Sequence, residues 1–162
     1  MGVSNMAEKR YWLFKSEPGD YSFADLMSEP DQTAEWDGVR NYQARNFLRD
    51  QVKEGDGVLF YHSSAKPTAV VGTAVVVRSG YPDYTAWGPS SDHPDPRSTP
   101  EKTIWYMVDI KAEAAFPNPV SLAQIRDTPA LRDMVLVNNS RLSVQPVTPE
   151  EWETVLSLGI ES

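Results

Sequence analysis

Residues 58–77, with the sequence VLFYHSSAKPTAVVGTAVVV, carry the clearest indication of the fold. Residues 58–61 are apolar, residues 69–77 are rich in β-branched side chains, and both compositions are typical of strands. A loop with Lys66-Pro67 joins them, so the stretch predicts a β-hairpin. Within the second strand, Gly72 indicates either a bulge or a place where the backbone closely approaches a ligand. The apolar run of residues 68–77 is shorter than the ~20 residues of a membrane span and predicts a buried strand.

The segments on either side of this hairpin predict three more strands and several short helices. The predicted strands are residues 11–15, 103–112 and 142–147, and the predicted helices are residues 23–28, 41–52, 121–127, 130–134 and 149–158. Capping boxes begin the helices that follow Ser22 and Ser121. Residues 81–100 are crowded with Pro, Asp, Ser and Gly and predict a long loop. This order predicts an α+β fold in which a curved, mostly antiparallel sheet closes into a small β-barrel with helices over its mouth.

Length and composition set limits on the organisation and the function of the chain. Its 162 residues suit one domain, which we expect at residues 11–160 after a disordered extension at residues 1–10. With no Cys there is no disulfide, thiolate zinc site or Cys nucleophile, and two His argue against a transition-metal site. The net charge of −8 argues against nonspecific coating of nucleic acid, which depends on neutralising phosphates. Any nucleic-acid contact is therefore expected to be local, at one base or nucleotide.

Two clusters in the first third of the chain are candidates for a binding site. Lys15-Ser16-Glu17 ends a predicted strand, where it forms either a polar turn or a group of amides, hydroxyl and carboxylate that meets a ligand. Trp36 precedes a glycine turn and is either part of the core or a wall on which a base stacks. Asn41 either caps the next helix or pairs with a base edge, as Asn amides can. Arg40 and Arg45 form either a solvated face or phosphate contacts.

A third cluster follows the first strand of the hairpin. Strand alternation predicts that Phe60 and Tyr61 point to opposite faces, with His62 and Ser63 at the strand end. His62 is either a structural hydrogen-bonding group or a catalyst paired with Ser16. Because the chain lacks a G-x-S-x-G nucleophile elbow, the hydrolase interpretation has little support from motifs. Arg141, before the last predicted strand, is the final candidate for a phosphate contact.

Taken in order, these segments closely resemble the EVE domain family over about residues 11–158. The resemblance is carried by residues 11–18, 20–22, 36–48, 55–56, 60–63, 81–83, 95–98, 105–109 and 141–146. It implies a PUA-like fold, similar to the YTH and SRA domains that bind methylated bases. By that analogy, Lys15-Ser16 and Trp36 match pocket residues of YTH domains. Two segments, residues 103–104 and 137–140, depart from the family pattern by lacking basic residues.

We therefore expect a binding module, not an enzyme, that recognises a modified base in DNA or RNA. The expected base-binding residues are Lys15, Ser16, Glu17, Trp36, Val39, Asn41, Tyr61, His62 and Ser63. The expected phosphate contacts are Arg40, Arg45, Lys66 and Arg141. We expect a monomer without metal, cofactor or membrane contact, located in the cytoplasm, or in the nucleus if the source is eukaryotic. The alternatives are a hydrolase of a modified nucleoside, similar to ASCH domains, and a protein-interaction module.

Overall fold

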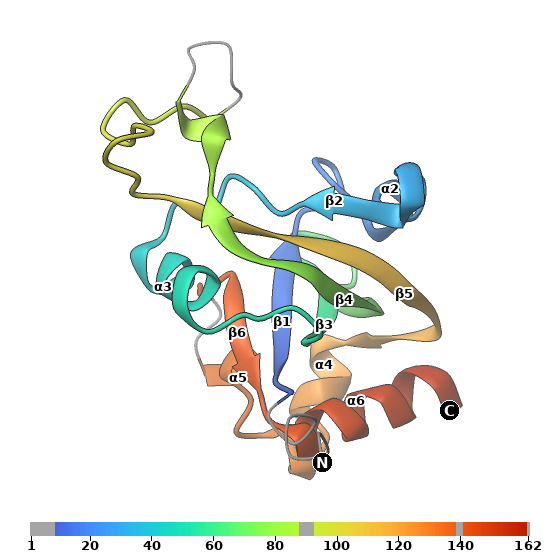
Figure 1. Ribbon diagram of the computed structural model, residues 1–162. Helices are drawn as coiled ribbons and strands as arrows, with labels where there is room; N and C mark the ends of the chain where they lie inside the picture. Colours follow the sequence, from blue (N-terminus) through green and yellow to red (C-terminus); the bar gives the residue numbers. More distant parts are fainter. Residues whose placement is uncertain (1–8, 88–92, 139–140, 162) are drawn as a thin grey trace, which may run out of the picture.

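A computed structural model describes residues 9–87, 93–138 and 141–161, so most of the expected N-terminal extension lies outside the described residues (Figure 1). The described strands are β1 (Tyr11–Ser16), β2 (Thr33–Glu35), β3 (Gly57–His62), β4 (Ala69–Pro82), β5 (Tyr106–Ser121) and β6 (Val144–Val147). The helices are α2 (Phe23–Met27), α3 (Tyr42–Asp50), α4 (Leu122–Arg126), α5 (Val135–Asn138) and α6 (Pro149–Glu161), with 3₁₀ turns η1 (Pro30–Gln32), η2 (Tyr84–Ala86) and η3 (Pro129–Leu131). These elements confirm the α+β class.

The six described strands form one sheet in the order β2-β5-β4-β3-β1-β6. All its pairings are antiparallel except that of β1 with β3, which is parallel. The long strands β4 and β5 curve across the molecule, as Figure 1 shows. Closure into a barrel is not confirmed, because no backbone pairing joins the end strands β2 and β6 in the described part of the chain.

The hairpin of β3 and β4 is confirmed, and Gly72 lies at its irregularity. The register shifts between Phe60 and Tyr61, which pair with Gly72 and Val70, so Val71 is bulged out. A Cβ on Gly72 would lie 2.6 Å from both the Ala114 carbonyl oxygen and the Phe23 ring. The close approach expected at this glycine is therefore to the neighbouring strand and to α2.

Strand alternation divides the apolar side chains between the two faces of the sheet. Phe14 and Phe60 belong to a core cluster that includes side chains of α2 and α3. Leu13 and Tyr61 belong to a second cluster, which α4, α5 and α6 cover. The prediction that Phe60 and Tyr61 point to opposite faces is therefore confirmed.

Several element boundaries differ from the prediction for identifiable reasons. β2 lies in a segment predicted as loop, and β4 continues to Pro82, into the predicted long loop. β5 begins at Tyr106 and continues to Ser121, beyond the predicted end at residue 112 and through Pro117 and Pro119. Because β2 pairs only with residues 109–111, the later part of β5 is a sheet edge, where proline is tolerated. In place of the helix predicted at residues 130–134, η3 covers its first two residues and α5 begins directly after it at Val135.

Candidate functional site

A cavity of about 1260 Å³ opens at the end of β1, beside β2 and the loop that follows it. It is lined by residues 15–17, 19–21 and 33–40, together with Glu29, Ser63, His93 and Ser143. The end of β1 and the residues around Trp36 are both segments that the sequence singled out, and the fold brings them to the same cavity.

The polar side chains at the ends of β1 and β3 hold the turn that borders this cavity. Ser16 and His62 are register partners on these parallel strands. The Ser16 hydroxyl donates to the carbonyl oxygen of Tyr21, and His62 Nε2 accepts the N–H of Phe23 at 3.0 Å. Burial lowers the pKa of His62 and so favours the neutral imidazole. Because Nε2 accepts the Phe23 N–H, the proton of the neutral ring is on Nδ1. Both side chains therefore fix the path of the chain into α2.

Trp36 borders the cavity but is mostly inside the first core cluster. Its side chain is only 8% exposed, with ring centroids of Phe14 and Phe60 each 5.4 Å from its own. Tyr21 packs edge-on against it at 6.3 Å, and the backbone N–H of Trp36 donates to the Val108 carbonyl at 2.7 Å. The indole is thus rigidly placed, and a small part of it is available to a ligand.

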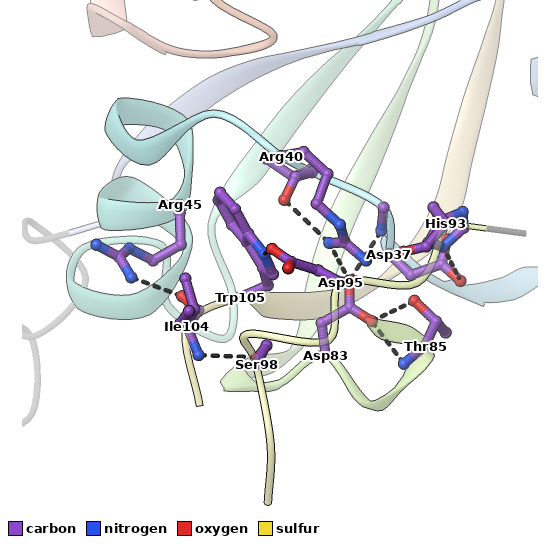
Figure 2. A network of polar contacts seen from close by, with 12 residues as sticks. Asp37, Arg40, Arg45, Asp83, Thr85, His93, Asp95, Ser98, Ile104 and Trp105 are labelled. Atoms are coloured by element: carbon purple, nitrogen blue, oxygen red, sulfur yellow. Dashed lines mark hydrogen bonds and ion pairs between the residues drawn. The ribbon is translucent and has the colours of Figure 1, made fainter. Parts of the chain in front are cut away.

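The loop after Trp36 is held from behind by the buried carboxylate of Asp83. Figure 2 shows Asp83 between the Arg40 guanidinium and Thr85. Its oxygens accept from Gly38 N–H at 2.9 Å, from Arg40 Nη1 at 3.1 Å, and from the Thr85 N–H and hydroxyl. Burial by itself would raise the pKa of Asp83, but the hydrogen bonds from Thr85, Gly38 and Arg40 outweigh it and lower the pKa. The carboxylate therefore stays ionised.

Gly38 fits this loop for two physical reasons. Its φ of +78° lies in the left-handed region, which residues with a Cβ rarely adopt. A Cβ there would also come within 3.2 Å of the His93 ring, which packs against the glycine. The loop is thus shaped closely around its neighbours.

The cavity rim carries more negative than positive charge. Glu17, Asp20, Glu29, Glu35 and Asp37 line it, against the cations Lys15 and Arg40 and the imidazole of His93. Burial raises the pKa of Asp37, although His93, whose Nε2 lies 3.6 Å from Asp37 Oδ2, opposes this effect. Burial also lowers the pKa of Lys15. The cavity is therefore rich in hydrogen-bond acceptors.

The model of the EVE domain family matches residues 10–158, which include every described strand and most of the last helix. The chain belongs to this family. It is 39% identical over 165 residues to human thymocyte nuclear protein 1, a match that covers 91% of this chain and 73% of that protein.

Solved structures share the fold of this EVE chain. A protein from Leishmania major is 44% identical and superposes with a TM-score of 0.88, covering 93% of this chain and 94% of that one. Human THYN1 in complex with DNA containing 5-methylcytosine is 38% identical with a TM-score of 0.89, covering 95% and 99% of the respective chains.

Six of the nine expected base-binding residues of this EVE chain line the cavity: Lys15, Ser16, Glu17, Trp36, Val39 and Ser63. The other three lie outside the lining. Asn41 caps α3, its Oδ1 accepting the Ala44 N–H at 2.9 Å. Tyr61 is 3% exposed in the second core cluster, and His62 binds the Phe23 N–H.

The expected phosphate contacts fall into two groups. Arg40 donates to the carbonyl oxygens of Val39 and His93 besides Asp83, and Arg45 donates to Ile104 and lies over the Tyr42 ring. These two guanidinium groups hold the protein's own segments together (Figure 2). Lys66 and Arg141, by contrast, are exposed on loops.

Several residues that shape the EVE cavity were not among the predicted site residues. Glu35, Asp37, His93 and the buried Asp83 belong to segments predicted as loops. The alternation of Thr33, Ala34 and Glu35 before Trp36 is a weak strand signal that could have placed two of them. The role of Asp83 in the cavity wall carries no such signal, because Gly38 and Arg40 lie 45 and 43 residues away from it in the sequence.

The described residues contain a second cavity of about 920 Å³ beside Tyr11, at the beginning of β1, which holds none of the expected site residues. Within residues 9–87, 93–138 and 141–161, no three His, Asp or Glu side chains gather as a metal site would require. None of the described helices has the length and apolar character to cross a membrane.

Proposed function

We propose that this EVE chain binds a modified base in DNA and that the base enters the cavity at the end of β1. One observation carries the proposal: human THYN1, which shares the fold at a TM-score of 0.89, was solved with DNA containing 5-methylcytosine. The cavity supports it by bringing an aromatic wall and polar edges together in a concave space, the usual form of a small-ligand site.

The chemistry of a single base suits such a space. A base is flat and apolar on its faces, and stacking it on an aromatic side chain contributes ~1–3 kcal/mol. Trp36 and Tyr21 supply the aromatic surface, and Ser16, Glu17 and Ser63 supply polar groups for the base edge. A methyl group adds only ~0.8 kcal/mol of burial, so selection of a modified base must come from the fit of the cavity.

The charge distribution supports entry of a base without its phosphates. A base in a duplex must be flipped out at a cost of a few kcal/mol. Acidic groups on the rim repel phosphate, so the sugar-phosphate backbone would stay outside the cavity. Lys66 and Arg141, whose side chains are exposed, are the expected cations that best fit phosphate contacts.

The remaining expectations are part of the same proposal. Residues 11–160 act as one EVE domain with a PUA-like, barrel-shaped sheet. RNA with a modified base is a further candidate ligand. The name of the human relative, thymocyte nuclear protein 1, supports a nuclear location if the source is eukaryotic.

No contact in the described site favours the hydrolase alternative. The Ser16 hydroxyl binds the Tyr21 carbonyl and His62 Nε2 binds the Phe23 N–H, so each of the two groups serves the backbone. A general base must instead reach the proton that it removes.

The test is titration of fluorescent oligonucleotides that differ only in cytosine or 5-methylcytosine at one position. We expect tighter binding of the methylated strand, and weaker binding by Trp36→Phe. The matched control is Trp152→Phe, because Trp152 is also 8% exposed but belongs to the second core cluster. Equal affinities for both strands, or equal losses in both variants, would contradict the proposal.

A further inference from the structure

We propose that the cavity selects a base whose edge donates hydrogen bonds, such as the amine of cytosine, and that Glu17 and Asp37 accept them. This inference rests on the proposed base-binding function and names the chemical class of the base. It is carried by the distribution of donors and acceptors over the cavity wall.

The acceptors differ in how far other residues already use them. Glu29 accepts the Tyr21 hydroxyl at 2.8 Å, and Glu35 accepts the Tyr84 hydroxyl. Glu17 follows directly on β1. Asp37 follows directly on Trp36, and its Oδ2 lies 3.6 Å from His93 Nε2, beyond hydrogen-bonding distance. Both side chains are exposed and line the cavity, one from the β1 segment and the other from the β2 segment. A base between these segments would meet a carboxylate from each.

Three donors of the wall have partners within the protein, and the first is Lys15, whose Nζ lies 5.9 Å from the centre of the Tyr61 ring. Arg40 directs its guanidinium to Val39, Asp83 and His93, so its N–H groups point toward the supporting loop. The Ser16 hydroxyl donates to the Tyr21 carbonyl. A base edge made of acceptors would therefore face carboxylates and leave polar groups unpaired, which is costly in a concave site.

Comparing thymine with 5-methylcytosine distinguishes recognition of the amine from recognition of the methyl group. Both carry the methyl at the same carbon, but 5-methylcytosine presents an amine beside it, where thymine presents a carbonyl oxygen. Carboxylates are suitable acceptors for the cytosine amine, and a well-made pair of base contacts discriminates by ~1–3 kcal/mol. That range corresponds to roughly 5- to 150-fold in affinity.

The experiment measures binding of single-stranded oligonucleotides with 5-methylcytosine, thymine or an abasic residue at one position, because single strands remove differences in pairing. We expect 5-methylcytosine to bind at least about fivefold more tightly than thymine. Asp37→Asn and Glu17→Gln should reduce this ratio, since an amide can donate to the thymine oxygen. Glu113→Gln, an exposed carboxylate on β5 outside the cavity lining, should leave it unchanged.

The outcomes separate this inference from the function on which it rests. Equal binding of 5-methylcytosine and thymine, both tighter than the abasic strand, would overturn the inference and leave base binding intact. A ratio that is unchanged in both carboxylate variants would also overturn the roles of Glu17 and Asp37. Binding of both bases no tighter than the abasic strand would overturn the inference and the proposed function together.

Discussion

Replacing the buried Asp83 by Asn should destabilise the protein and loosen the cavity wall. The Asp83 side chain is fully buried, and the Arg40 side chain bound to it is 23% exposed. Asp83 accepts hydrogen bonds from Gly38, Arg40 and Thr85, so all of its partners are donors. An Asn keeps the shape but places an NH₂ group against donors and removes the negative charge opposite Arg40.

The size of the effect follows from the burial of the pair. Removing one partner of a buried ion pair costs about 3–5 kcal/mol, and the partial exposure of Arg40 places this pair near the lower end, at about 3 kcal/mol. For a chain of this length, each kcal/mol lowers Tm by roughly 2–4 °C, so we expect a drop of roughly 6–12 °C.

The pH dependence has a definite sign. Because the folded state lowers the pKa of Asp83, its stabilisation is fully present above the unfolded value of about 3.9. It is lost as the pH falls through the folded pKa. The stability difference between the parent and Asp83→Asn should therefore be constant near pH 7 and shrink in strong acid.

Urea unfolding followed by circular dichroism measures these differences at each pH. The control is Asp133→Asn, because Asp133 is exposed between η3 and α5. Measuring Arg40→Met alone and together with Asp83→Asn completes a double-mutant cycle, in which we expect a coupling energy of at least about 1 kcal/mol. A coupling near zero, or an Asp83→Asn protein as stable as the parent, would refute the assignment of Asp83 as the support of this wall.

Three other substitutions test the packing and the hydrogen bonds around the cavity. Trp36→Ala should cost about 3–5 kcal/mol of unfolding free energy, since the indole is part of the core; a loss below about 1 kcal/mol in urea unfolding would contradict that burial. Gly72→Ala should cost about 1–3 kcal/mol, because its Cβ would overlap the Ala114 carbonyl and the Phe23 ring, and an unchanged Tm would show that β4 and β5 separate easily. The parent should lose stability as the pH falls below about 6.5, because burial lowers the pKa of His62 and protonation then favours the unfolded chain. His62→Gln should remove that part of the pH dependence, and identical slopes for both proteins between pH 7.5 and 5.5 would refute it.

Local rules predicted the elements whose stability is local. The capping box of Ser22 and Asp25 begins α2 as expected, and Asn41 caps α3. The β3–β4 hairpin is also predictable, because both of its strands and their loop lie within residues 57–82. In each case the interacting groups are close in sequence, so composition and spacing carry the necessary information.

The part that was not predicted depends on contacts between distant segments. Residues 33–35 form a strand only because β5 pairs with them at residues 109–111. Arg40 and Arg45 illustrate the same limit for function, since a guanidinium that binds phosphate and one that binds a carbonyl 59 residues away, as Arg45 does, are identical in sequence. Tertiary structure alone distinguishes them.

Some parts of the cavity could be predicted from local sequence, and others depend on contacts between distant segments. Its β1 end and the segment around Trp36 were identifiable because aromatic and polar residue types there suit a base. The segment around Asp83 contributes through the groups that it holds, since its carboxylate binds the backbone of Gly38 and the side chain of Arg40, both in the cavity wall. A change at Asp83 should therefore weaken ligand binding through the position of the wall. In a protein that already lacks the Arg40 contact, Asp83→Asn should weaken ligand binding little further. Substituting a residue that touches the base should weaken binding by the same factor whether or not the pair of Asp83 and Arg40 is present.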